Sequence, residues 1–243
     1  PANLCMKTFG KIGEKCGIPH EFGSTGFGVA HAAAIAAESA GLDLKKATVA
    51  IHGFGNVGTF AYRYLRDMGA TIVAIADKSG AVYASEGLDH RELAEVIAGK
   101  KVLRDSAGYK SIGVEEFWKT PVDIFIPASV TDVINDQNKR DIRSKVIVEA
   151  GNIPMREAVE EELFARGILI VPDFVANAGG VISSYAEYRG YNPKRMFELV
   201  ERKIKASTRL VLETSSKRKI SPRMAALAIA QEKVRAATKD GIL

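Results

Sequence analysis

Gly53-Phe54-Gly55-Asn56-Val57-Gly58 is the stretch that decides the fold of this chain. It follows the apolar run 48–52 and opens a helix-like stretch that continues to Leu65. A strand, a glycine turn and a helix in this order are the context of a dinucleotide-binding fingerprint. Its first glycine allows the tight turn, its second lets the backbone approach a pyrophosphate, and its third lets helix and strand pack closely. We therefore predict that phosphates face the start of this helix.

A second apolar run, residues 70–76, ends at Asp77. Asp77 follows Gly58 by about 20 residues, the separation expected of the acid that accepts hydrogen bonds from the adenosine ribose. On its own, an Asp before Ser79-Gly80 would be taken as a turn former. Asp77 favours the free ribose hydroxyl of NAD, whereas Lys78 beside it could attract the 2′-phosphate of NADP. The cofactor is therefore NAD or NADP, with NAD favoured.

Bulk composition excludes several classes of protein. The 243 residues, 47% hydrophobic and 26% charged, are ordinary for a soluble globular protein of one large or two small domains. Without an apolar run near the roughly 20 residues of a membrane span, no membrane partner is expected. Cys5 and Cys16 form neither a disulfide framework nor a metal spacing, which suggests reduced thiols in the cytoplasm. The net charge of +5 is dispersed and lacks interleaved aromatic residues, which argues against a nucleic-acid partner.

Short apolar runs alternate with helical patterns along most of the chain. This alternation predicts an α/β fold: a Rossmann-type, doubly wound, mainly parallel sheet with a C-terminal helical tail. The expected strands are 48–51, 71–75, 123–126, 146–149 and 168–171, with a small extra strand at 81–83. The expected helices are 28–40, 57–68, 90–98, 130–142, 155–166, 181–189, 193–215 and 221–238.

Local signals set the helix ends and the domain limits. Ser24 and Thr25 are expected to cap the first helix, and Gly41 to end it. Ser221 suits the N-cap of the last helix. The run Glu160-Glu161-Glu162 is expected to be an exposed helix face. The predicted domains are an N-terminal segment of unclear role (1–20), a dinucleotide-binding domain (21–180), and a helical tail packed on it or on a partner (181–243).

In a doubly wound sheet, ligands bind beyond the carboxyl ends of the strands. The third strand here exits through Ala128-Ser129, the fourth through Gly151-Asn152, and the fifth through a stretch containing Asn177. An asparagine side chain offers both a donor and an acceptor, matching a carboxamide or a ribose hydroxyl. Asparagine and glycine also make simple turns, but two asparagines at adjacent strand ends favour a ligand site.

The sequence shows neither a catalytic set nor a metal site. The four histidines lack metal-ligand spacing and are expected to be solvated or hydrogen-bonded in place: His20, His31, His52 and His90. His52 stands out because it directly precedes the glycine turn. No serine lies in a nucleophile elbow, so the catalytic residues stay unidentified.

Several motifs together resemble the cofactor domain of glutamate dehydrogenases. They are the glycine turn, the runs Thr25-Gly26-Phe27-Gly28-Val29 and Asp173-Phe174-Val175-Ala176-Asn177-Ala178-Gly179-Gly180-Val181, and the stretches Ile124–Ala128 and Glu86–Asp89. The resemblance covers about residues 21–243 and implies reversible oxidative deamination of L-glutamate to 2-oxoglutarate and ammonia with NAD or NADP.

The resemblance also implies a role for each matching residue. Backbone N–H groups of Asn56 and Val57 would meet the pyrophosphate. The nicotinamide, its ribose and the adenosine ribose would be lined by Thr25, Ala128, Ser129, Asn152 and Asn177. The pocket for the glutamate side chain would include Val181 and Ser184, with the Ser184 hydroxyl bonding the distal carboxylate.

Two departures from the family qualify this assignment. The order Ala150-Gly151-Asn152 exchanges two small residues, and the loop 21–25 is compressed. The family's catalytic lysine and aspartate lie in a substrate domain that residues 1–20 cannot replace. The chain alone is thus expected to be inactive and to work with a substrate domain or partner chain, as a homo-oligomer. The alternative is a stand-alone, non-catalytic dinucleotide-binding subunit that regulates or partners another protein.

Overall fold

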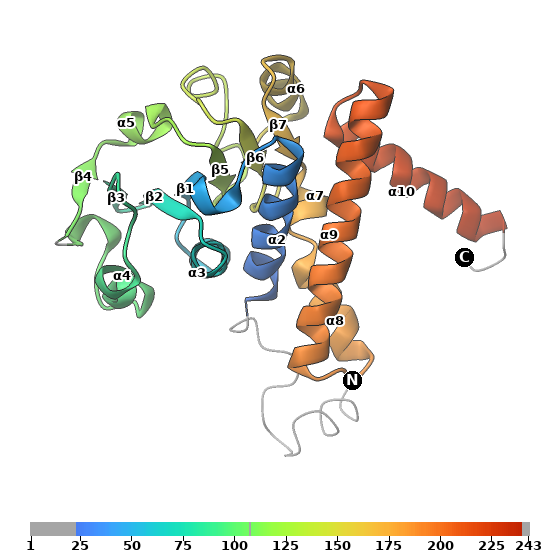
Figure 1. Ribbon diagram of the computed structural model, residues 1–243, viewed down its shortest axis with the longest axis horizontal. Helices are drawn as coiled ribbons and strands as arrows, with labels where there is room; N and C mark the ends of the chain where they lie inside the picture. Colours follow the sequence, from blue (N-terminus) through green and yellow to red (C-terminus); the bar gives the residue numbers. More distant parts are fainter. Residues whose placement is uncertain (1–22, 107, 240–243) are drawn as a thin grey trace.

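The chain forms one mixed seven-stranded sheet covered by helices on both faces (Figure 1). The computed structural model describes residues 23–106 and 108–239, so the predicted segment 1–20 lies outside the described residues. The strands are β1 (Thr48–His52), β2 (Thr71–Asp77), β3 (Gly80–Tyr83), β4 (Lys110–Ile112), β5 (Ile124–Pro127), β6 (Val146–Val148) and β7 (Leu169–Val171).

The strand order is β4-β3-β2-β1-β5-β6-β7. Strands β2, β1, β5, β6 and β7 run parallel, whereas β3 and β4 add an antiparallel edge. The chain leaves β1 toward β2 on one side and later returns to β5 on the other. The doubly wound fold predicted from the sequence is therefore confirmed, and the end of β1 lies at the point where the strand order reverses.

Helices bury both faces of the sheet, and successive strand residues point to opposite faces. Val49 and Ile51 therefore join the hydrophobic cluster on one face, while Ala50 joins a second cluster on the other face. The longer helices are α2 (Ser24–Ser39), α3 (Asn56–Asp67), α4 (His90–Ile97), α6 (Glu157–Ala165), α8 (Gly179–Tyr188), α9 (Pro193–Arg218) and α10 (Pro222–Lys239). The shorter ones are α5 (Val114–Lys119), α7 (Asp173–Ala176), and the 3-10 turns η2 (Leu44–Lys46) and η3 (Leu103–Asp105).

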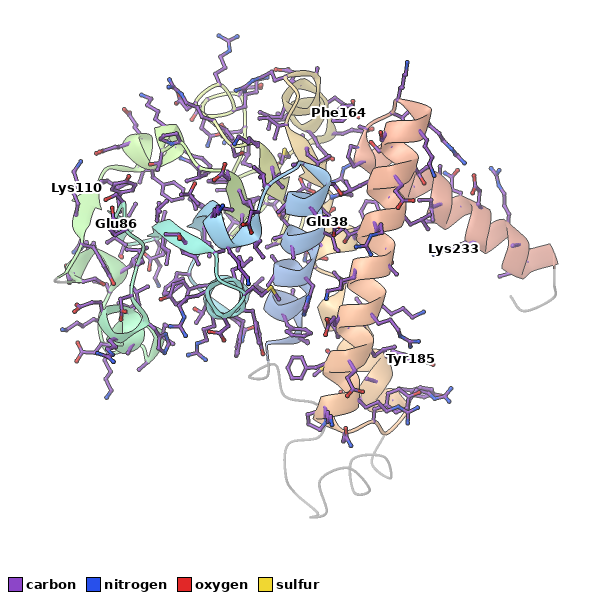
Figure 2. All side chains as sticks on the ribbon, in the orientation of Figure 1. Glu38, Glu86, Lys110, Phe164, Tyr185 and Lys233 are labelled. Atoms are coloured by element: carbon purple, nitrogen blue, oxygen red, sulfur yellow. The ribbon has the colours of Figure 1, made fainter. Side chains whose placement is uncertain are left out.

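The C-terminal helices confirm the predicted tail. Helix α9 runs beside α2 and contacts α8, while α10 extends away from the sheet (Figure 1). Ser221 caps α10 as predicted, because its Oγ accepts a hydrogen bond from the Met224 N–H at 3.4 Å. Figure 2 places Lys233 on α10 at one side of the molecule and Lys110 on β4 at the other. None of the described helices is long and apolar enough to cross a membrane.

The helix expected over 130–142 is wrong: this segment is a series of turns. Its short polar side chains satisfy the backbone locally instead. Asn138 Nδ2 donates to the Val133 carbonyl at 2.8 Å, and Asn138 Oδ1 accepts from the Asn135 N–H at 2.9 Å. Such bonds compete with a helical hydrogen-bond ladder.

The expected capping by Ser24 and Thr25 is also wrong. Helix α2 already includes both residues, and its N-cap is Gly23 in the left-handed region, at φ +68°. A side chain at Gly23 would overlap the Phe60 ring. Freed from capping, the Ser24 hydroxyl donates to Ser183 Oγ at 3.1 Å and ties α2 to α8.

Candidate dinucleotide site

The first and third glycines of the turn are required by the chain's own packing. A Cβ on Gly53, whose φ is +103°, would lie 2.6 Å from the Ala128 carbonyl oxygen. A Cβ on Gly58 would lie only 1.9 Å from the Gly53 carbonyl oxygen. The approach at Gly58 packs α3 closely against the end of β1, as the fingerprint predicts, and the approach at Gly53 packs the turn against the exit of β5.

Among the described residues, no packing contact requires the second glycine, Gly55, to lack a side chain. A Cβ on Gly55 would meet no atom within 4 Å, and its φ of −81° is open to any residue. Gly55 is exposed and is the N-cap of α3. The first N–H groups of a helix project beyond its N-terminus, so α3 presents those of Asn56 and Val57 at this open space. The turn therefore has the shape and polarity to hold a pyrophosphate.

Asp77 lies at the end of β2, beside the turn, where the Gly53 N–H donates to the Ala76 carbonyl at 2.7 Å. Its Oδ1 accepts from the backbone N–H of Ser79 at 2.7 Å and from the Ser79 hydroxyl at 2.6 Å. Asp77 thus forms a turn through Oδ1. The hydrogen bond predicted from a ribose hydroxyl would be accepted by its second oxygen, Oδ2. Lys78 next to it is exposed.

The exit of β5 is braced from β1. The Ala128 N–H donates to the His52 carbonyl at 2.7 Å, and His52 Nδ1 lies 2.8 Å from Ser129 Oγ. The His52 ring stacks on Trp118 with centroids 4.8 Å apart. Burial lowers the pKa of His52, so the ring is neutral at neutral pH. His52 is hydrogen-bonded in place, as the sequence suggested, and fixes Ser129 next to the glycine turn.

The two predicted asparagines meet. Asn177 Nδ2 donates to Asn152 Oδ1 at 2.8 Å, which joins the exits of β6 and β7. The Gly151 N–H donates to the Pro127 carbonyl at 2.8 Å, so this pair adjoins the exit of β5. The exits of β1, β5, β6 and β7 therefore form one continuous polar edge.

Thr25 and the predicted substrate residues gather at the start of α8. A Cβ on Gly180 would lie 2.9 Å from Thr25 Oγ1. Val181 is 75% exposed, and the exposed Ser184 donates its hydroxyl to the Gly180 carbonyl at 3.3 Å. Ser184 would have to rotate that hydroxyl to donate to a substrate carboxylate.

Sequence reasoning missed a buried ionic group behind the asparagines, which we term the Arg223 cluster: Arg223, Glu149, Glu160 and Asp173. Arg223 Nη2 donates to Glu149 Oε2 at 2.8 Å and to Asp173 Oδ1 at 3.1 Å, and Nε donates to Glu160 Oε2. The side chains of Glu149 and Glu160 are 0% and 1% exposed. The prediction of an exposed face was therefore wrong for Glu160. The signal was present in its spacing between Val159 and Leu163, both buried.

Three carboxylates share one guanidinium in this cluster. Burial raises the pKa of Glu149 well above its ordinary value, and the charge of Glu160 raises it further. Burial likewise raises the pKa of Glu160. Among the described residues, Glu149 Oε1 and Glu160 Oε1 find no hydrogen-bond partner, which favours the neutral form of a buried carboxyl. No group of histidines, cysteines and acids in the described part of the chain could hold a metal ion.

The sequence model of the glutamate/leucine/phenylalanine/valine dehydrogenase family matches residues 16–241 of this chain. The chain belongs to this family of oxidoreductases. The resemblance to it that the motifs indicated is confirmed, and the predicted elements and site residues come from the matched region.

Curated relatives in this family carry both cofactor specificities. A glutamate dehydrogenase of Aeropyrum pernix is 41% identical over 179 residues, which are 74% of this chain and 43% of the relative. An NAD-specific glutamate dehydrogenase of Clostridioides difficile is 39% identical, covering 73% and 45%. An NADP-specific one of Saccharolobus shibatae is 38% identical, covering 74% and 42%. The matched part of the chain spans less than half the length of these relatives.

Solved structures of the family share the fold. The hetero-hexameric glutamate dehydrogenase of Thermus thermophilus, in its leucine-bound form, superimposes with a TM-score of 0.78 at 26% identity, covering 90% of this chain and 53% of that one. The glutamate dehydrogenase of Peptoniphilus asaccharolyticus gives 0.73 at 29% identity, covering 89% and 52%.

Proposed function

We propose that this chain is the cofactor-binding part of a glutamate dehydrogenase-like oxidoreductase. Its reaction is the reversible, NAD(P)-dependent oxidative deamination of L-glutamate to 2-oxoglutarate and ammonia. The observation that carries the proposal is the open space at Gly55, at the N-terminus of α3 and at the reversal point of the strand order. The family relatives with NAD or NADP specificity support the cofactor class.

In this proposal, the polar edge holds the dinucleotide along its length. Gly53–Gly58 bind the pyrophosphate, and Asp77 binds the adenosine ribose. Residues at the exits of β5, β6 and β7, with Thr25 on α2, bind the nicotinamide and its ribose: Ala128, Ser129, Asn152 and Asn177. When bound, the nicotinamide ring supplies the acceptor or donor of a hydride.

The chain's part in the reaction is to orient the ring and line one side of the substrate pocket. Val181 and Ser184 supply this lining, and the 75% exposure of Val181 fits a surface that another domain completes. We place the dinucleotide-binding domain over 21–180 and the helical tail over 181–243. The acid–base groups would come from a substrate domain, in the same protein or in a partner, within a homo-oligomer.

Calorimetric titration of the chain with NADH and with NADPH, separately, tests the proposal. Saturable binding of at least one of them is expected, with NADH favoured by Asp77. Failure to bind either, by a protein whose circular dichroism shows it to be folded, would refute a dinucleotide site.

A further inference from the structure

The asparagine pair depends on a chain of contacts that begins outside the sheet. The residue that follows Asn152 in the chain is Ile153, a β-branched residue at φ +47°. β-Branched residues rarely adopt this left-handed conformation, so surrounding contacts must hold it. One contact is direct: the Ile153 N–H donates to Asp173 Oδ2 at 2.9 Å.

Asp173 also sets the second asparagine. Its backbone carbonyl accepts from the Asn177 N–H at 2.8 Å and closes the single turn of α7. One residue thus holds the backbone next to Asn152 through its side chain and the backbone of Asn177 through its carbonyl. The position of Asp173 decides whether the two amide groups can meet.

Arg223 fixes Asp173 from α10. Its Nη2 bridges Asp173 Oδ1 and Glu149 Oε2, while Glu149 Oε2 accepts from the Asp173 N–H at 2.7 Å. Arg223 therefore holds the Asp173 side chain, and Glu149 holds its backbone N–H. The Arg223 guanidinium also lies over the Phe174 ring, 5.4 Å from its centroid. Only a planar fork with several donors can make these bonds at once.

We propose that Arg223 is a positioning residue for the nicotinamide end of the cofactor site, acting through Asp173 on Asn152 and Asn177. This rests on the proposed function and adds that the docking of α10 governs how well the nicotinamide half is held. The adenosine half would bind at the glycine turn and Asp77, at the exits of β1 and β2, whereas the Arg223 cluster lies behind the exits of β6 and β7, so we expect the affinity for the adenosine half to be independent of the cluster.

Arg223→Lys tests the proposal, because a lysine keeps the charge but cannot make the three bonds of the fork. NADH and ADP-ribose, which lacks the nicotinamide, are titrated against the full chain. We expect the variant to bind NADH about tenfold more weakly, the upper end of what the loss of one hydrogen bond between neutral groups gives, and ADP-ribose with unchanged affinity. Arg218→Lys is the matched control, since the Arg218–Glu232 pair joins α9 to α10 on the exposed surface, and it should change neither affinity.

Hydrogen exchange supplies a readout that a general loss of stability would not reproduce. In Arg223→Lys, the amides of Ile153 and Asn177 should exchange faster while those of β1 keep their protection. Equal weakening of NADH and ADP-ribose, or faster exchange throughout the sheet, would overturn the positioning role. A wild-type chain that binds ADP-ribose as tightly as NADH would overturn it too while leaving the dinucleotide site intact. Binding of neither ligand would instead defeat the proposed function, and this inference with it.

Discussion

At the scale of single residues, packing requires glycine at two of the three glycine positions in the turn but not at the third. Gly53 and Gly58 are excluded from carrying a side chain by the Ala128 and Gly53 carbonyl oxygens. Gly55 is restricted by no atom within 4 Å. Fold and ligand binding can therefore be separated by substitution within one motif.

Gly55→Val should leave the fold intact and weaken dinucleotide binding, because the valine side chain fills the space beside the N–H groups of Asn56 and Val57. Losing one charge-assisted hydrogen bond of about 1.5–3 kcal/mol weakens binding roughly 10- to 150-fold. Gly113→Val is a matched control, since Gly113 is also a helix N-cap with nothing within 4 Å of its Cβ position. Calorimetry with NADH measures the effect, and unchanged affinity in Gly55→Val would show that phosphates bind elsewhere.

Gly58→Ala should instead destabilise the fold, since its Cβ would overlap the Gly53 carbonyl oxygen. Overpacking of this kind costs about 1–3 kcal/mol or more. Urea unfolding would report the loss as a lower free energy of unfolding. A Gly58→Ala variant as stable as the wild type would mean that α3 can move away from β1 at little cost.

Asp77→Ala should weaken NADH more than NADPH, because only the free ribose hydroxyls donate to the carboxylate. The loss for NADH should be about 10- to 150-fold, the range for a hydrogen bond to a charged group. Ser79→Ala is the control: it removes one bond to Asp77 Oδ1 and leaves the carboxylate in place. Equal losses for the two cofactors would remove Asp77 from the ribose site.

At the scale of elements, the Arg223 cluster gives the chain a pH dependence of known sign. Burial raises the pKa of Glu149 in the folded chain above the unfolded value of about 4.3. Between these two values the folded chain binds more protons than the unfolded chain, so the free energy of unfolding falls as pH rises. Above the folded value, this contribution is constant.

Glu149→Gln should therefore flatten the fall in unfolding free energy as the pH rises above about 4.3, measured by urea unfolding. Each unit of pKa shift removed corresponds to about 1.4 kcal/mol. Comparison with the wild type cancels groups of opposite sign, such as Glu201, whose pKa is lowered by its bond to Lys205. An exposed control, Glu115→Gln, should keep the wild-type slope, and an equally steep slope in Glu149→Gln would contradict the raised pKa.

The elements that local patterns specify could be predicted from the sequence. The strands from β1 to β7 that carry continuous apolar runs were expected, as were Asn152 and Asn177 at adjacent exits. The errors at 130–142 and at Ser24 arise where side chains bond to the nearby backbone or across to another helix. β4 escaped prediction because Lys110-Ser111 is exposed and polar. The spacing of Glu160 to the buried Val159 and Leu163 indicated its burial, but its ionic partner, Arg223, lies 63 residues away, and no local pattern reports such a partner.

At the scale of the whole molecule, two helices of the tail expose large apolar side chains. Val181 at the start of α8 is 75% exposed, and α10 presents Leu227 and Val234 to solvent at 42% and 56%. Exposed apolar groups of this kind are typical of surfaces that another domain or subunit covers. The length of the family relatives, more than twice the matched part, agrees with this.

The purified 243-residue chain should bind NADH but not reduce NAD or NADP in the presence of L-glutamate. We expect this because, in the proposal above, a substrate domain supplies the groups for acid–base work on the amino carbon. The absorbance of NADH over time measures turnover, with a full-length relative as the positive control. Glutamate-dependent turnover by the chain alone would show that its own residues supply the chemistry.

The overlap that a side chain at position 58 would make with the Gly53 carbonyl oxygen also bears on how sequences of this kind change over evolutionary time. A descendant that lost its cofactor would still be held to Gly53 and Gly58 by the needs of folding, whereas Gly55 would be released to mutate. Gly53 and Gly58 would then persist because the fold requires them, without any cofactor bound. Retention of the middle one is the mark of a lineage still selected to hold a dinucleotide.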